Sequence, residues 1–357
     1  MLSFLKKRDY QATIHPDGRV LVVKGGEKLL TAALEAGLDW PHDCRVGSCG
    51  TCRCILKSGK IKPLTDFVYT LELDDLKAGA ILACQSQLRS DVVVEVTLGA
   101  QESVAIEKHQ GRIGEIRHLT HDIQHVVVSV DAAAFADARA GQYAEITIEG
   151  LNEPRSYSFA NAPGGGEPGR ISFFIRHVPG GEFTDWLFTR DRTGAVLALS
   201  GPYGSFYHRP ADGRMICIAG GSGLAPIHAL LEEGVRSGLR RDCVVLFGAR
   251  TRADLFYLDE LTAIGRSWSG SFEVLPVLSE EPASGKWTGA RGMVPDVLSE
   301  VVDGSGFGTG DQGYLCGPPP MVDAGIERLK ALGMRDNRIF CDKFLDASTQ
   351  PGGRAAM

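Results

Sequence analysis

The chain has 357 residues, a length that suits two or three domains rather than a single core. Its content of 43% hydrophobic and 23% charged residues is typical of a globular protein and excludes a disordered or fibrous one. The formal net charge of −6, without any polybasic block, gives no reason to expect nucleic-acid binding. The longest mainly apolar stretch, residues 215–231, is interrupted by glycine and proline, so we expect no membrane segment and a cytoplasmic location.

Residues 1–100 are expected to form a small domain of mixed β structure with one helix. Two alternating apolar runs flank the break Pro16-Asp17-Gly18, which is the pattern of a β-hairpin. A later run of helical spacing stops at a glycine, as helices often do. The predicted elements are strands at 12–14, 20–23 and 92–96 and a helix at 29–36.

The rest of the chain divides into a β-rich part and an α/β part. Residues 101–110 are polar and unpatterned, as in a linker. Short β runs with barrel-like spacing then occupy residues 111–210, and strands alternate with helices, as in a parallel sheet, over residues 211–346. The tail 347–357 is expected to be disordered. Predicted strands lie at 124–130, 143–148, 171–176, 195–199, 215–219, 243–247, 272–277 and 313–316.

Four of the nine cysteines have the spacing of a plant-type [2Fe–2S] cluster: Cys44-x4-Cys49-x2-Cys52, followed by Cys84. Small residues between the first three cysteines allow the backbone to wrap the cluster and to donate N–H groups to its sulfurs. A structural zinc site is the alternative, but zinc sites usually pair two short Cys-x-x-Cys knuckles. A fifth cysteine, Cys54, lies in an apolar strand and is expected to be a buried structural thiol.

Two weak motifs in the β-rich part indicate a flavin site. The first, Arg155-Ser156-Tyr157-Ser158, lies between predicted strands; its arginine can neutralise a pyrophosphate, its tyrosine can cover a flavin ring, and a hydroxyl can reach the flavin N5. The second, Gly180-Gly181-Glu182-Phe183-Thr184, leads into a predicted helix at 185–188, and a glycine turn before a helix is a phosphate-binding pattern. Each alone would more often be an ordinary surface strand or turn.

Two further motifs indicate a nicotinamide nucleotide site. An apolar strand runs into Gly220-Gly221-Ser222-Gly223, the strand–turn–helix pattern that binds a pyrophosphate, although Pro226 breaks the standard dinucleotide fingerprint. A second loop, Cys316-Gly317-Pro318, follows a late strand, and its glycine permits the close approach of a flat ring. A nucleophilic role for Cys316 is the alternative, but no base is recognisable near it in the sequence.

Taken together, these motifs resemble the ferredoxin–NAD(P)H reductase-like components of bacterial multicomponent oxygenases, such as the benzoate dioxygenase, phenol hydroxylase and soluble methane monooxygenase reductases. The resemblance also rests on the segments 201–204, 220–226 and 316–321. It implies a β-grasp ferredoxin domain, an antiparallel β-barrel for FAD and a Rossmann-like domain for NAD. Where relatives have a Glu-Lys-Phe-like segment, this chain has Asp342-Lys343-Phe344, with a shorter acid.

The resemblance also implies roles for individual residues. Ser158 and Cys316 would position the reacting atoms of flavin and nicotinamide. The metal ligands would be Cys44, Cys49, Cys52 and Cys84. The cofactor-binding residues would be Arg155, Ser156, Tyr157, Ser158, Arg176, Gly180, Gly181, Phe183, Thr184 and Phe344 for FAD, with Gly220, Gly221, Ser222, Gly223, Cys316, Gly317 and Pro318 for the nucleotide.

The expected function is electron transfer from NADH through FAD and [2Fe–2S] to a terminal oxygenase, Rieske-type or di-iron, or to its ferredoxin. The chain would be a monomer when free. An electron-relay subunit with little nicotinamide turnover is the alternative, and a redox sensor a weaker one. Coenzyme choice stays open between NADH and NADPH, because Arg250 and Arg252 could favour a 2′-phosphate and the first acid beyond them is Asp254. Acidic and basic residues nearly balance over 1–100, which gives no support for an acidic docking surface.

Overall fold

The computed structural model describes residues 8–42, 45, 47, 50–99, 106–151, 154–163, 167–282, 285–301 and 306–344. The chain divides into two compact units, an N-terminal unit that ends at Ile106 and a C-terminal unit spanning Glu107–Asp346. Among the described residues, no helix is both long enough and apolar enough to cross a membrane. The predicted tail 347–357 lies outside the described residues.

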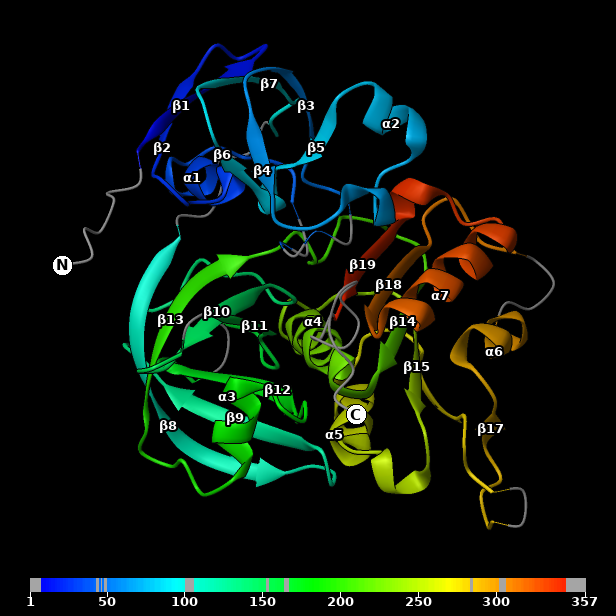
Figure 1. The fold of residues 1–357 in the computed structure, drawn as a ribbon. Helices are drawn as coiled ribbons and strands as arrows, with labels where there is room; N and C mark the ends of the chain where they lie inside the picture. Colours follow the sequence, from blue (N-terminus) through cyan, green and yellow to red (C-terminus); the bar gives the residue numbers. More distant parts are fainter. Residues whose placement is uncertain are drawn as a thin grey trace. The chain divides into compact units, whose positions relative to one another are not determined.

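The N-terminal unit is a mixed five-stranded sheet of order β2-β1-β7-β3-β5 with a small β4–β6 ribbon beside it (Figure 1). Alternation explains the hairpin at its edge, because Leu21 and Val23 are buried while Val20 and Val22 face solvent. The strands are β1 (Tyr10–His15), β2 (Val20–Val23), β3 (Arg53–Ser58), β4 (Ile61–Pro63), β5 (Ala80–Leu82), β6 (Ser86–Leu88) and β7 (Val92–Glu95), and the helices are α1 (Leu29–Glu35) and α2 (Leu73–Lys77).

The first part of the C-terminal unit is a six-stranded antiparallel sheet of order β11-β10-β13-β8-β9-β12. A bridge between Phe159 and Phe173 links the two edge strands and closes the sheet into a barrel, whose core both phenylalanines help to fill. The elements are β8 (Glu107–His118), β9 (Ile123–Ser129), β10 (Tyr143–Thr147), β11 (Arg155–Ser158), β12 (Arg170–Arg176), α3 (Glu182–Phe188) and β13 (Val196–Tyr203).

The second part is an all-parallel sheet of order β17-β16-β15-β14-β18-β19. Its first strand, β14, is buried along its whole length, as expected of a central strand covered on both faces. The elements are β14 (Met215–Gly220), α4 (Leu224–Arg236), β15 (Cys243–Ala249), α5 (Leu258–Ser267), β16 (Phe272–Leu278), β17 (Ala290–Arg291), α6 (Val294–Val301), β18 (Gln312–Gly317), α7 (Pro319–Ala331) and β19 (Ile339–Lys343).

The barrel and the parallel sheet share one apolar core, which explains why they form a single unit. Ile123 and Phe174 of the barrel belong to the same buried cluster as Leu230 of α4 and Phe247 of β15. A polar contact also joins the barrel to α4: the Glu232 carboxylate accepts a hydrogen bond from the Ala162 amide at 3.0 Å. The barrel and the parallel sheet are therefore joined by both apolar and polar contacts.

Two segments differ from the sequence prediction. Residues 107–110, predicted as linker, begin the long strand β8, because the strand is held by pairing with β13 rather than by an apolar pattern of its own. Residues 155–158, predicted to lie between strands, form the edge strand β11 paired with β10. In both segments the residues are mainly polar, so their strand character comes from their neighbours in the sheet.

Candidate functional site

Two of the four predicted cluster ligands, Cys52 and Cys84, lie within the described part of the chain, whereas Cys44 and Cys49 lie outside it. Cys52 immediately precedes β3, and Cys84 follows β5, the strand that pairs with β3. The Ala83 amide donates to the Cys52 carbonyl at 3.2 Å, which fixes the two segments together. Both cysteines are buried, at 2% and 1% exposure. Pairing of the strands thus brings together two predicted ligands that are 32 residues apart in the sequence.

The described residues before Cys52 include two glycines whose backbone conformation suits a tight loop. Gly47 has φ +90° and Gly50 has φ +76°, values that favour glycine. The Thr70 hydroxyl donates to the Gly47 carbonyl at 2.6 Å, and the Gln85 amide to the Arg45 carbonyl at 3.2 Å. These bonds engage carbonyl groups of the loop. The thiols of Cys52 and Cys84 and the positive φ values of Gly47 and Gly50 fit a [2Fe–2S] cluster.

Cys54 differs from the two described ligands in its environment. It lies on β3 with 2% exposure, and burial, together with the nearby Cys52, raises the pKa of its thiol well above the usual value. A buried thiol that stays protonated packs as a small apolar group. The structure therefore agrees with a structural role for this cysteine.

The flavin strand β11 presents the three side chains that the sequence singled out. Tyr157 is stacked obliquely on Phe183 of α3, with ring centroids 5.4 Å apart. Burial raises the pKa of the Tyr157 hydroxyl, which therefore stays protonated at all ordinary pH values. The Arg155 guanidinium lies 4.0 Å from the Glu182 carboxylate. Residues of β11 and of the 180–184 turn thus form one neighbourhood.

The glycine pair precedes a helix as predicted, but α3 begins at Glu182, three residues before the predicted start, with Gly181 as the residue before the helix and Gly180 at φ +78°. The Thr184 hydroxyl, however, is used inside the turn: it donates to the Val178 carbonyl at 2.9 Å and accepts from the Val178 amide at 3.1 Å. A threonine engaged in this way shapes the turn. Backbone N–H groups at the start of α3 are then the donors best suited to a phosphate.

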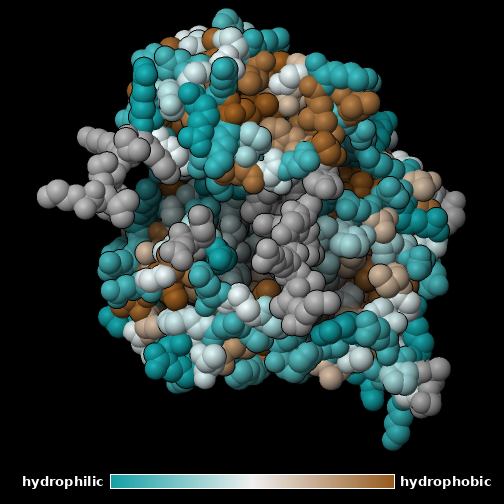
Figure 2. Space-filling model, viewed as in Figure 1, coloured by the Kyte–Doolittle hydropathy of each residue, from teal (hydrophilic) through white to brown (hydrophobic). Residues whose placement is uncertain are grey.

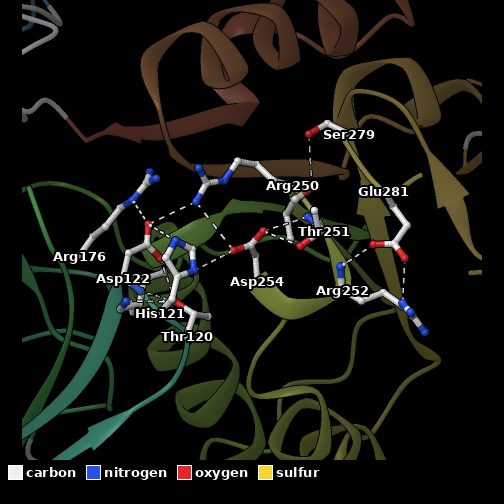
Figure 3. Close-up of polar contacts among 12 residues, drawn as sticks. Thr120, His121, Asp122, Arg176, Arg250, Thr251, Arg252, Asp254, Ser279 and Glu281 are labelled. Atoms are coloured by element: carbon white, nitrogen blue, oxygen red, sulfur yellow. Dashed lines mark hydrogen bonds and ion pairs between the residues drawn. The ribbon is translucent and has the colours of Figure 1, made fainter. Parts of the chain in front are cut away.

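Arg176 belongs to a different group of side chains from β11. At the end of β12 its Nε donates to the Asp122 carboxylate at 2.9 Å, and Arg250, after β15, lies 3.4 Å from the same oxygen (Figure 3). His121, Asp122 and Asp254 bring possible metal-ligand atoms within 4.8 Å of one another. Two guanidinium groups already compensate Asp122, so this group is an ion-pair network across the barrel and the parallel sheet.

The glycine turn after β14 and the loop after β18 are in direct contact. A Cβ on Gly223 would lie 2.3 Å from the Cys316 carbonyl oxygen, and one on Gly220 would lie 2.7 Å from the Met321 sulfur and 3.0 Å from Pro318. Helix α4 begins at Leu224 and accommodates Pro226 in its first turn, as predicted. Both loops lie where the strand order reverses, between β14 and β18, which is where open parallel sheets bind ligands.

The flavin strand meets the nicotinamide loop through β19. The Ser158 hydroxyl donates to the Asp342 carboxylate at 3.3 Å, and Asp342 is the register partner of Cys316. Burial and the neighbouring Asp342 raise the pKa of the Cys316 thiol, so it is a poor thiolate nucleophile. The Phe344 amide donates to the Gly317 carbonyl at 2.9 Å. Ser158, Cys316 and Phe344 are therefore brought together, and Asp342 joins them.

Comparisons with known proteins agree with this geometry. Three family models match the chain: a 2Fe-2S iron–sulfur cluster binding domain over residues 12–89, an oxidoreductase FAD-binding domain over 110–208 and an oxidoreductase NAD-binding domain over 217–325. The xylene/toluene monooxygenase electron transfer component XylA of Pseudomonas putida is 40% identical over 96% of this chain and 95% of its own length. The chain belongs to the family of iron–sulfur flavoprotein reductase components of oxygenases.

Other members of the family extend the match. The reductase component of propane 2-monooxygenase from Mycolicibacterium goodii is 33% identical over 90% of this chain and 93% of its own. The crystal structure of the Amycolatopsis cytochrome P450 reductase GcoB superimposes with a TM-score of 0.79 and 31% identity, covering 94% of this chain and 98% of that one. The reductase described here is an NAD(P)H-dependent electron-transfer oxidoreductase with [2Fe–2S], FAD and NAD(P)H as its cofactors.

Proposed function

We propose that the reductase takes electrons from NADH where β11 meets the loop after β18, and passes them out through the cluster bound by Cys44, Cys49, Cys52 and Cys84. The observation that carries this proposal is the contact of Ser158 with Asp342, beside Cys316. FAD, when bound, supplies the link between a donor of two electrons and a centre that accepts one.

In this proposal the chain's own residues bind and orient. Arg155 and the amides at the start of α3 bind the flavin pyrophosphate, Tyr157 covers the ring, and the Ser158 hydroxyl points to its reactive edge. The turn 220–223 binds the nucleotide phosphates, and the loop 316–318 holds the nicotinamide ring against the flavin. Asp342 orients the Ser158 hydroxyl by accepting a hydrogen bond from it.

Ser158→Ala tests this arrangement. We expect flavin reduction by NADH, followed by stopped-flow absorbance, to slow about tenfold, the equivalent of losing one hydrogen bond. Cluster reduction by reduced flavin in the same variant serves as the internal control and should keep its rate. Unchanged flavin bleaching would remove Ser158 from the site.

We propose a terminal oxygenase or its ferredoxin as the electron acceptor. Support comes from the family: the relatives named above are components of a xylene/toluene monooxygenase and a propane 2-monooxygenase. The N-terminal unit also has apolar residues at its surface (Figure 2), and the segment from the end of β4 to the start of α2 exposes Leu64, Val68 and Leu73 by 39%, 56% and 66%. The same segment contacts the cluster loop through Thr70, so a partner that covers these residues would approach the cluster.

Reduction of cytochrome c by NADH with the isolated chain distinguishes this function from that of a relay subunit, which would give little turnover. Purification of the bound partner from cells then identifies the acceptor. We further propose that the free reductase is a cytoplasmic monomer; its buried thiols at Cys54, Cys217 and Cys316, which form no disulfide, suit a reducing compartment.

A further inference from the structure

The rim of the parallel sheet next to the phosphate turn carries an unusual concentration of paired charge. β15 lies beside β14 in parallel register, with Gly248 opposite Gly220. The chain leaving β15 therefore runs along the same edge as the glycine turn, where the adenosine ribose of a dinucleotide lies. The residues there are Arg250, Thr251 and Arg252, and an arginine at this place can accept a 2′-phosphate.

Arg252 is held by a carboxylate from the neighbouring strand. Glu281, three residues beyond β16, accepts from the Arg252 Nε at 2.8 Å and from the Arg252 backbone amide at 3.0 Å (Figure 3). Its side chain is only 6% exposed, whereas the Arg252 side chain is 53% exposed. These hydrogen bonds lower the pKa of Glu281, and the bond from the Arg252 amide has the largest effect. The carboxylate is therefore ionised near neutral pH.

The position of Glu281 is fixed by the backbone. The Ser279 amide donates to the Ala249 carbonyl at 3.1 Å and the Glu280 amide to the Arg250 carbonyl at 2.8 Å, which ties the segment after β16 to the segment after β15. The Arg291 guanidinium donates to the Glu281 carbonyl at 2.6 Å. These bonds hold the backbone of Glu281 beside the segment that carries Arg252.

Arg250 is compensated in a similar way. Its guanidinium lies 3.4 Å from Asp122 and 3.8 Å from Asp254, while Asp254 also accepts from the Thr251 amide and hydroxyl. The two arginines that the sequence offered as phosphate ligands thus both face carboxylates. Glu281 engages Arg252 through both of its oxygens, one at the guanidinium and one at the backbone amide.

We propose that Glu281 is a specificity-determining residue that directs the reductase to NADH by neutralising Arg252 in advance. This inference rests on the proposed nucleotide site. A 2′-phosphate that reached Arg252 would lie beside the Glu281 carboxylate, and the repulsion of like charges disfavours NADPH. A 2′-hydroxyl carries no charge and meets no such opposition. Glu281 acts through Arg252 and needs no contact with the ribose.

Binding of two nucleotide fragments to the full-length holoprotein tests the proposal without depending on turnover. Calorimetric titration with 5′-AMP and with 2′,5′-ADP gives the ratio of their affinities in the wild type and in Glu281→Gln. We expect the substitution to raise the affinity for 2′,5′-ADP about tenfold relative to 5′-AMP, the effect of one removed charge near the phosphate. Arg252→Ala in the Glu281→Gln background should cancel the gain.

Glu280→Gln is the matched control, because it removes the same charge one residue away at an exposed position. An equal gain in that variant would mean that net charge alone sets the preference and would overturn the proposal. So would an unchanged ratio in Glu281→Gln, or a loss of 5′-AMP affinity with no gain for 2′,5′-ADP, which would make Glu281 a ribose ligand. Failure of the wild type to bind either fragment would instead contradict the nucleotide site itself.

Discussion

Two glycine-containing loops, one in each unit, belong to the predicted cluster and nucleotide sites, and the constraint that favours glycine differs between them. In the cluster loop, Gly47 has φ +90°, a backbone direction that other residues adopt only with strain. In the turn after β14, Gly223 has an ordinary helical φ of −61°, but a Cβ there would lie 2.3 Å from the Cys316 carbonyl. At Gly47 the φ value favours glycine and a Cβ would also lie 2.6 Å from the Gln85 Cγ, whereas at Gly223 only the size of the residue is limiting.

This difference teaches how each site is assembled. In the cluster loop, the carbonyl groups of Gly47 and Arg45 accept from the side chains of Thr70 and Gln85. The nucleotide turn takes its shape from the close approach of another loop almost a hundred residues further along the chain. Damage to the first loop should therefore stay local to the cluster, and damage to the second should spread through the parallel sheet.

The largest expected effect comes from Cys84→Ser. Loss of this ligand should remove the cluster and with it one-electron reduction of cytochrome c, because the hydroxyl is a much poorer ligand for iron than a thiolate. NADH-driven reduction of ferricyanide directly from the flavin should continue, since the C-terminal unit has its own core. Iron and sulfide content, the visible spectrum and the two activities measure this separation.

The control for Cys84→Ser is Cys54→Ser, a change of the same kind at a buried cysteine outside the ligand set. Cys54→Ser should keep its iron while losing stability, because it places a hydroxyl in an apolar strand. If it lost iron to the same extent as Cys84→Ser, the assignment of ligands would be wrong.

A second and smaller effect is expected from Gly223→Ala. The added methyl group overlaps the Cys316 carbonyl, so the variant should be less stable by about 1–3 kcal/mol and should raise the KM for NADH. Urea unfolding and steady-state kinetics report the two effects. Gly221→Ala is the matched variant, because its Cβ would meet open space and only its φ of +54° is unfavourable. Equal effects on KM in both variants would contradict the role of close approach.

The smallest effect concerns pH and should be confined to the C-terminal unit. Burial, aided by Arg117, lowers the pKa of His125 to about 4. Its Nδ1 lies 3.1 Å from the Arg117 Nη2 and 3.2 Å from the Tyr257 hydroxyl, so it serves as an acceptor and the ring is neutral. The unfolded state binds a proton near pH 6.5 and the folded state only near pH 4. Stability therefore falls as pH drops through this window.

Between pH 7 and pH 5 this histidine should account for a loss of about 2 kcal/mol in the free energy of unfolding. Urea unfolding, monitored by flavin fluorescence, measures this loss in the wild type and in His125→Gln. The variant should not show the loss of about 2 kcal/mol that His125 causes. His121→Gln, at a side chain that is 64% exposed, is the comparison variant and should keep it. A pH profile that His125→Gln leaves unaltered would contradict the assignment.

Much of the fold could be predicted because its main strands have clear hydrophobic patterns in the sequence. The apolar runs that became β14, β15 and β16 and the alternating runs of β1 and β2 begin and end within two residues of the predicted limits. The polar strands β8 and β11 could not be recognised, since their hydrogen-bond partners, rather than their own side chains, make them strands.

The functional residues divide in the same way. Motifs contained in one short segment, such as 220–223 and 316–318, were visible in the sequence. Contacts between distant segments were not: Asp342 lies 184 residues from Ser158, and only the pairing of β18 with β19 gives the acid its place. Arg176 was expected at the flavin and is found paired with Asp122. Glu281 could not be predicted as a functional residue, because it belongs to no recognisable motif.

The contact between Gly223 and Cys316 limits how this reductase can be altered. The turn 220–223 and the loop 316–318 are packed in direct contact. A larger residue in one segment would therefore displace the other, so substitutions in the two segments must be made together. The segments after β15 and β16 are joined by backbone hydrogen bonds and by the Arg252–Glu281 ion pair, and the side chains of Arg250 and Arg252 are exposed. Redesign of the coenzyme preference is therefore best confined to that outer rim, with the two inner loops left untouched.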